Sequence, residues 1–154
     1  MKTTRVLALS VLTVLVACSA AQMSIPLTQL VTLNAANNAF SSQTTLVVRD
    51  QESWQELWSR MNATISPAPP VPAVDFSKDL VLVAAAGTRP TGGFSVAITN
   101  AAESGGEVIV NATITSPGRN CIVTQALTSP VHAVTMARRD APISFQVGQE
   151  VRNC

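Results

Sequence analysis

The second half of this 154-residue chain alternates between β-patterned segments and turn signals, and this rhythm constrains the fold most strongly. From Asp79 onward, pairs such as Gly105-Gly106 and Pro117-Gly118 separate these segments at spacings of about 8 to 12 residues. Such spacing is typical of an antiparallel sheet, because each tight turn returns the chain beside the strand just completed. We therefore predict an α+β, mainly β fold: an antiparallel sheet or sandwich of about six to eight strands, with one amphipathic helix packed on it.

The expected strands differ in how many of their faces are buried. Residues 80–86 form a continuous apolar run with β-branched side chains, which is typical of a strand buried on both faces. Residues 94–99 and 108–115 alternate instead, as a strand with one buried face does. Further strands are expected at 44–49, 121–127, 131–137 and 143–147.

One helix of about 12 residues is expected after residue 49, and it is marginal alone in water. A single apolar stripe runs along it at i, i+3, i+4 and i+7, formed by Trp54, Leu57, Trp58 and Met61. Asp50 suits the N-cap position, and Ser53 with Glu56 offers a second capping box. We expect the stripe to pack on the sheet; the alternative is that the two tryptophans form a binding surface.

The first residues have the layout of an export signal. A positive start precedes an apolar run at 6–16, which is too short to span a bilayer as a stable helix. Residues 15–18, Leu-Val-Ala-Cys, resemble the bacterial lipobox, whose cysteine thiol receives a diacylglyceryl group and becomes the new N-terminus. We predict a lipoprotein signal peptide at 1–17 and lipidation of Cys18. The alternative is ordinary signal-peptidase cleavage near residues 20–21.

Lipid on Cys18 would fix where the protein works. Acyl chains such as palmitate contribute roughly 0.8 kcal/mol per buried CH₂, which for two or three chains gives stable membrane attachment. We expect a cell-envelope protein that faces the periplasm or the cell exterior. Ser19 stands where a retention-type Asp would be, which favours the outer membrane in a cell with two. Residues 18–42 are predicted to be a polar tether with a short strand at 27–33, and residues 43–154 the folded domain.

Charge and cysteine content narrow the choice of partners and of redox state. Residues 1–17 hold two of the 10 Lys and Arg and none of the 9 Asp and Glu, so the processed chain has a net charge near −1. Without a basic patch, nucleic acid is not an expected partner. With Cys18 lipidated, Cys121 and Cys154 remain as one pair, which an oxidising compartment permits to form a disulfide. The alternative is two free thiols.

No catalytic residue, metal site or cofactor is predicted. His132 is the one histidine, so a Ser-His-Asp triad must use it, with Ser129 nearby; its β-patterned surroundings beside Pro130 favour a structural role. Lys78 is a weaker candidate base, because it lies in the charged stretch 75–79. A zinc site needs three or four clustered ligands, which one histidine and a disulfide cannot supply.

The most unusual segment is the glycine-rich loop, which we define as residues 87–94, Gly-Thr-Arg-Pro-Thr-Gly-Gly-Phe. Proline fixes one φ and glycine permits positive φ or close backbone approach. The loop opens a strand rather than a helix, so phosphate binding is not expected. It is either a connection that needs glycine geometry or an exposed recognition loop with Arg89 as its charged contact. The candidate recognition residues are Gly87, Arg89, Pro90, Thr91, Gly92 and Gly93.

Several motifs, taken in order, resemble one known family. They are Trp-x-x-x-Trp at 54–58, Val-Asp-Phe-Ser-Lys at 74–78, the apolar strand, the glycine-rich loop, and Thr-Gln-Ala-Leu-Thr-Ser-Pro at 124–130. This order resembles the C-terminal domain of the protease complex subunit PrcB family over about residues 40–147. One departure is Val131, where an aromatic residue is expected, which argues against an aromatic recognition surface there.

The resemblance implies a non-catalytic, exported lipoprotein domain. The founding member associates with a surface subtilisin-like protease and supports that complex. We therefore expect a binding or accessory module whose partner is a protein such as an exported protease, with the membrane reached through the lipid anchor. The alternatives are a protease inhibitor or small-ligand-binding lipoprotein and, less favoured, a hydrolase that uses His132.

Overall fold

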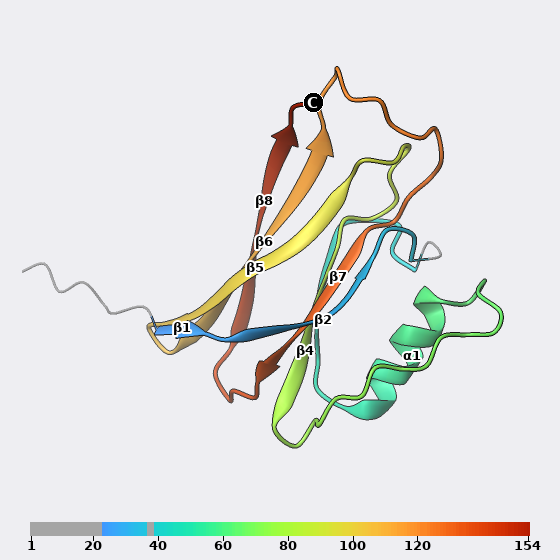
Figure 1. Ribbon diagram of the computed structural model, residues 1–154. Helices are drawn as coiled ribbons and strands as arrows, with labels where there is room; N and C mark the ends of the chain where they lie inside the picture. The colour runs from blue at the N-terminus through green and yellow to red at the C-terminus, as the bar shows by residue number, and fades with distance from the viewer. Residues whose placement is uncertain (1–22, 37–38) are drawn as a thin grey trace, which may run out of the picture.

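A computed structural model describes residues 23–36 and 39–154, in which eight strands and one helix form three layers (Figure 1). Two four-stranded sheets lie face to face, and the helix covers the outer face of the second sheet. The predicted α+β, mainly β fold is therefore confirmed. The predicted signal peptide and Cys18 lie outside the described residues. Within the described residues, no helix has the length and apolar character needed to cross a bilayer.

Each sheet combines strands from distant parts of the chain. The first sheet has the order β1 (Met23–Ile25), β5 (Ser95–Ser104), β6 (Glu107–Pro117) and β8 (Ile143–Arg152). The second sheet has the order β2 (Leu27–Leu33), β7 (Val131–Ala137), β4 (Asp79–Ala85) and β3 (Thr44–Val48). All neighbours are antiparallel except β6 and β8, which run parallel because β8 returns from β7 in the other sheet.

The strand β4 explains the continuous apolar run in the sequence. Leu80 and Leu82 point between the sheets, whereas Val81 and Val83 point toward the helix, and all four are fully buried. Burying one such side chain contributes roughly 1.5 to 3 kcal/mol. The inter-sheet core is completed by alternating residues of β5 and β6 in the facing sheet and of β7 beside β4: Val96, Ile98, Val108, Val110, Ala112, Ile114, Val134 and Met136.

The helix α1 (Gln51–Met61) begins where the sequence predicts. The Asp50 carboxylate accepts the Ser53 N–H at 2.8 Å, so Asp50 is the N-cap and the second capping box does not begin the helix. All four stripe residues are buried against the second sheet, which rules out the alternative that the tryptophans form an open binding surface. Each indole N–H instead donates to the proline-rich connector, Trp54 to Pro72 O and Trp58 to Pro69 O, both at 3.0 Å.

Three features differ from the prediction. The strands β1 and β2 belong to the two sheets, so the folded domain begins before residue 43. Residues 121–127, expected to be a strand, form an irregular loop with no ladder partner. The last strand continues to Arg152, well beyond the expected residue 147, because β6 provides a partner along its whole length.

Candidate functional site

Two loops meet at the end of the sandwich that carries the C-terminus (Figure 1). One is the glycine-rich loop, and the other, which we call the crosslinked loop, comprises residues 118–130. Arg89 and Thr128 exchange backbone hydrogen bonds of 2.8 and 3.0 Å, and the Gly92 N–H donates to Thr124 O at 2.9 Å. Because buried backbone groups need such partners, these bonds fix the two loops against each other.

The glycines of the first loop are required by the close approach of its neighbours. Gly87 has a φ of 80°, and a Cβ there would lie 2.6 Å from the Ser42 carbonyl carbon. Gly93 has a φ of 83°, and its Cβ would lie 2.8 Å from a methyl carbon of Val123. Both positions therefore combine a backbone conformation that favours glycine with a lack of space for any side chain. This supports the first interpretation of the loop, a connection that needs glycine geometry.

The Arg89 side chain is half-buried and bonded to its own loop. Its Nη2 donates to Ala86 O at 2.7 Å, and its guanidinium carbon lies 5.4 Å from the centre of the Phe94 ring, which is cation–π geometry. These contacts give Arg89 a bracing role. The residue of the loop that is most open to solvent is Pro90, and Thr91 beside it is half-buried.

A disulfide joins the crosslinked loop to the end of the chain. Cys121 and Cys154 are bonded, with their Cα atoms 5.1 Å apart, so the predicted pairing is present. The Gly118 N–H also donates to Arg152 O at 2.9 Å, beside the bridge. A chain terminus that would otherwise fray is thereby fastened to the loop.

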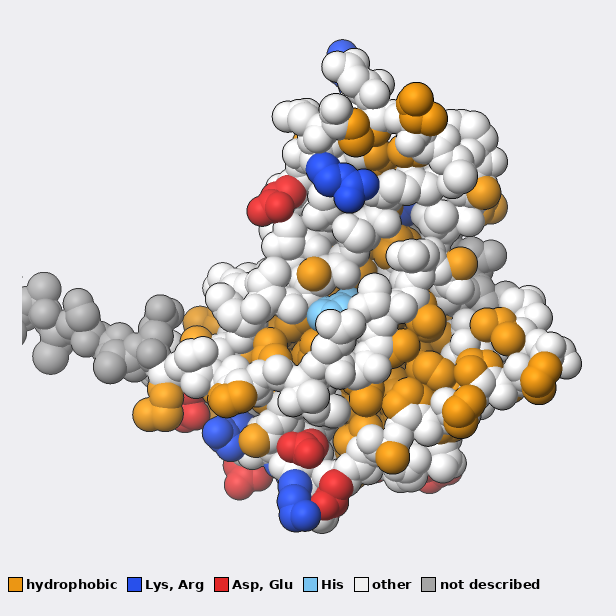
Figure 2. All heavy atoms as spheres, in the orientation of Figure 1, with side chains coloured by type: hydrophobic (Ala, Val, Ile, Leu, Met, Phe, Trp, Pro, Cys, Tyr) orange, Lys and Arg blue, Asp and Glu red, His pale blue; other side chains and the backbone are white. Residues whose placement is uncertain are grey.

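This braced end exposes apolar side chains, which we call the apical surface. Ile122 is 103% exposed, Leu127 66% and Val151 65%. Figure 2 shows hydrophobic side chains open to solvent at this upper end of the molecule. Ile122 and Leu127 were not predicted as a surface because residues 121–127 were expected to be a strand. No local signal argued against a strand, because Ile122, Val123 and Thr124 are all β-branched.

A pocket of about 370 Å³ lies beside the apical surface. It is lined mainly by small and polar residues from the two loops, together with one cation from the end of β8; they are Asn34, Gly92, Gly93, Phe94, Ser95, Thr124, Thr128 and Arg152. The glycine-rich loop therefore contributes to a concave surface even though its arginine is committed to the loop itself. Such a pocket can accept a small polar or anionic group.

His132 links the two sheets. It lies on β7, and its Nδ1 accepts the Ile98 N–H of β5 at 2.9 Å, immediately before the bulge between Ile98 and Asn100. A bulge disrupts the sheet ladder locally, and the imidazole supplies the acceptor that this N–H needs. Burial lowers the pKa of His132, since it disfavours the charged ring. The Ser129 hydroxyl points elsewhere, toward Phe40 O at 3.5 Å.

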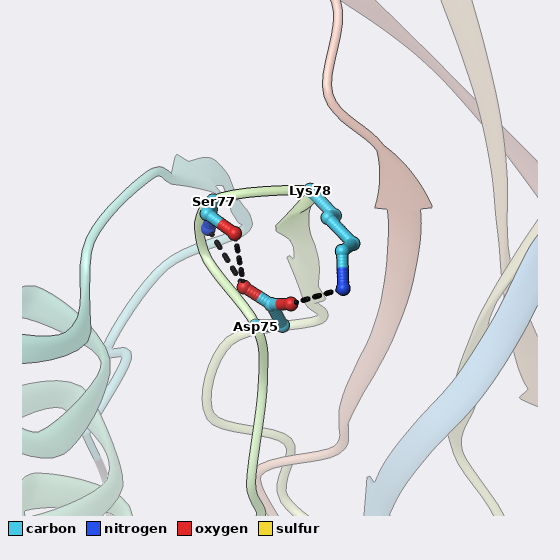
Figure 3. A network of polar contacts seen from close by, with 3 residues as sticks. All are labelled: Asp75, Ser77 and Lys78. Atoms are coloured by element: carbon cyan, nitrogen blue, oxygen red, sulfur yellow. Dashed lines mark hydrogen bonds and ion pairs between the residues drawn. The ribbon is translucent and has the colours of Figure 1, made fainter.

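Lys78 stabilises a turn at the start of β4 (Figure 3). Its Nζ lies 2.9 Å from the Asp75 carboxylate, which also accepts the N–H and the hydroxyl of Ser77. Hydrogen bonds from Ser77, followed by the contact with Lys78, lower the pKa of Asp75 to about 2. Among the described residues, no three His, Cys, Asp or Glu side chains are grouped as metal ligands would be.

One of three comparisons with known proteins found a match. Residues 80–137 match the family model described as PrcB C-terminal, a stretch that runs from β4 to the end of β7 and contains both loops. No curated protein and no solved structure matches the chain. The resemblance predicted from the sequence is therefore confirmed over residues 80–137, which match the PrcB C-terminal family model.

Proposed function

We propose that this protein is a non-catalytic accessory module of the cell envelope, held at a membrane by lipid on Cys18, that binds a partner protein such as an exported protease. The family match supports an association with a protease complex. The observation that carries the proposal is the apical surface, where two apolar side chains of the crosslinked loop and one at the end of β8 stand in solvent on a backbone braced by hydrogen bonds and a disulfide.

Exposed apolar residues on a fixed backbone favour protein binding for two reasons. Covering them with a partner removes apolar area from water, which contributes about 25 cal/mol per Å². The backbone beneath them is already ordered by the Cys121–Cys154 bridge and the bonds between the loops, so association costs less conformational entropy than ordering a free loop does. Single exposed apolar residues are common on protein surfaces, so what favours binding here is the position of these three on an ordered end of the domain.

The position of the anchor is consistent with this role. Cys18 lies five residues before β1, and β1 pairs with Ala101–Glu103, at the far end of β5 from the glycine-rich loop. Figure 1 shows β1 well removed from the end that carries the C-terminus. A lipid on Cys18 would therefore leave the apical surface directed away from the bilayer and open to a partner.

Two exposed positions allow a test that leaves the fold unchanged. The full chain would be purified from detergent extracts of its own cells, as wild type and as the double variant Ile122→Ser with Leu127→Ser. Ile65→Ser is the matched control, since Ile65 is 49% exposed but lies in the connector after α1. Exposed substitutions usually change stability by less than about 0.5 kcal/mol. We expect the double variant, but not the control, to lose its partner; equal recovery of the same proteins by all three would refute the proposal.

The membrane part of the proposal has its own test. Cys18→Ser removes the thiol that the lipid needs, so the protein should move from the membrane fraction to the soluble exported fraction. Unchanged partitioning would rule out lipid on this residue. It would not bear on the apical surface, which the pull-down tests separately.

A second function is favoured by the pocket beside Arg152. A small anionic ligand would be held there by the Arg152 guanidinium and by the polar groups of Asn34, Thr124 and Thr128. Alternatively, the exposed Pro90 would enter the cleft of a protease as an inhibitor does. Inhibition assays against exported proteases, with wild type and Arg152→Gln, separate these activities from simple association. Stable complex formation without loss of protease activity would favour the accessory module.

A further inference from the structure

The four strands at the sheet edges differ in how well they resist pairing with another chain. In the described residues these are β1 and β8 in the first sheet and β2 and β3 in the second. In an antiparallel pair, alternate residues direct their N–H and C=O groups away from the neighbour, so each edge strand has a row of unpaired backbone groups. Proteins usually block such edges with charges, proline, bulges or very short strands.

Three of the edges carry such a block. The strand β1 has three residues and is followed by Pro26. A register shift between Gln29 and Val31 interrupts β2. Gly148, Glu150 and Arg152 fall within β8. By contrast, β3 reads Thr-Thr-Leu-Val-Val and pairs with β4 in unbroken register, without a charge, a proline or a bulge.

The free edge of β3 also opens into a groove. A cavity of about 390 Å³ lies between β3 and α1, lined by Leu46, Val47, Val48, Arg49, Asp50, Ser53, Glu56, Leu57 and Arg60. Its apolar part includes Leu46, which is 36% exposed, and Leu57, which is buried beneath it. A strand edge beside a helix provides both a row of backbone partners and an apolar wall, and recognition by strand addition uses this combination.

The charged side chains around the groove determine which peptide sequences would bind there. Arg49 follows the end of β3, and Arg60 lies toward the other end of α1, where its Nη2 donates to Ala39 O at 3.1 Å. Within the described residues neither arginine has a carboxylate in ion-pair distance. Asp50 is committed to the helix cap, and Glu56 lies on α1 between the two ends of the groove. Acidic residues flanking an apolar segment would therefore be favoured at both ends of the groove.

We propose that β3 binds an extended segment of a partner protein as an added strand. Side chains of a strand alternate between its two faces, so every second residue of the segment is apolar and points toward Leu46 and Leu57, and acidic residues flank this core. The site shares no residue with the apical surface. It therefore stands or fails independently of the function proposed above.

Selection from a library of random linear nonapeptides displayed on phage, with the full chain as target, tests the site. We expect enrichment of peptides with alternating apolar residues and acidic flanks. The selected peptide should protect amide hydrogens of β3 from exchange. Leu46→Lys should weaken binding at least tenfold because it places a charge on the apolar wall. Gln146→Lys, on the exposed edge strand β8, is the matched control and should leave affinity within about twofold.

A change in the peptide provides a second measurement that cannot be confused with misfolding of the protein. Replacing two alternate central residues of the selected peptide by proline removes backbone donors, so it should abolish binding to wild type if the peptide pairs as a strand. Binding that persists would overturn the proposal. So would protection of β1, β2 or β8 instead of β3, a library from which no sequence is enriched, or pairing of β3 with a second copy of this chain.

Discussion

Two glycines with the same backbone conformation and different surroundings allow the packing of the glycine-rich loop to be tested by substitution with alanine. Gly87 and Gly105 both have positive φ, 80° and 62°. A Cβ at Gly105 would have no heavy atom within 4 Å, whereas a Cβ at Gly87 would lie 2.6 Å from the Ser42 carbonyl carbon. Gly105→Ala should therefore cost only the left-handed conformation, about 1 kcal/mol. Gly87→Ala adds a clash with backbone that cannot rotate away, typically about 1 to 3 kcal/mol more.

Urea unfolding of the two variants, followed by tryptophan fluorescence, measures this difference directly. We expect the free energy of unfolding to fall by about 1 kcal/mol for Gly105→Ala and by about 2 to 4 kcal/mol for Gly87→Ala. Asparagine tolerates positive φ better than alanine does, so Gly105→Asn should recover most of the loss and Gly87→Asn should recover none. Equal losses at the two positions would refute the reasoning that close backbone approach, rather than φ alone, requires glycine in the loop.

Three further predictions follow from buried or crosslinked groups. Burial lowers the pKa of His132, so below about pH 6.5 the unfolded state binds more protons than the folded state does. The unfolding temperature should therefore fall as the pH drops from 7 to 5. This fall should be smaller in His132→Asn, which keeps an acceptor for the Ile98 N–H. Cys154→Ser opens a loop with a sequence separation of 33 and should lower the free energy of unfolding by about 3 to 4 kcal/mol, a loss that reduction of wild type should reproduce. Trp58→Phe removes the hydrogen bond to Pro69 O and should lower the free energy of unfolding by about 1 kcal/mol. Proteolysis of the proline-rich connector should become faster, while the rate of cleavage at other sites stays the same.

The elements that sequence reasoning predicted well are those whose burial pattern is complete within one segment. The stripe from Trp54 to Met61 identifies the buried face of α1, because helical periodicity alone determines which side chains share a face. The apolar run of β4 indicates burial on both faces, and the sheets and the helix supply those two contacts. For such segments the local sequence is enough to predict which faces are buried.

The features that were missed depend on partners elsewhere in the chain. Residues 121–127 have strand-like composition, yet no neighbouring edge accepts them, because β8 occupies the edge of β6 and pairs with it in parallel. The polar segment before residue 43 gains its strand structure from β5 and β7, which are distant in sequence. Arg89 was predicted as a recognition contact on charge alone, whereas its carbonyl and ring partners become visible only once the loop is folded.

The most direct test of the central claim, that the braced C-terminal end binds a protein, is photo-crosslinking in intact cells. A photoreactive amino acid would replace Ile122 in one strain and Ile65 in another, both exposed positions on the same domain. We predict one discrete high-mass adduct from position 122, identified by mass spectrometry as an exported protein, and none from position 65. The absence of an adduct at position 122, or the same adducts from both positions, would contradict the account.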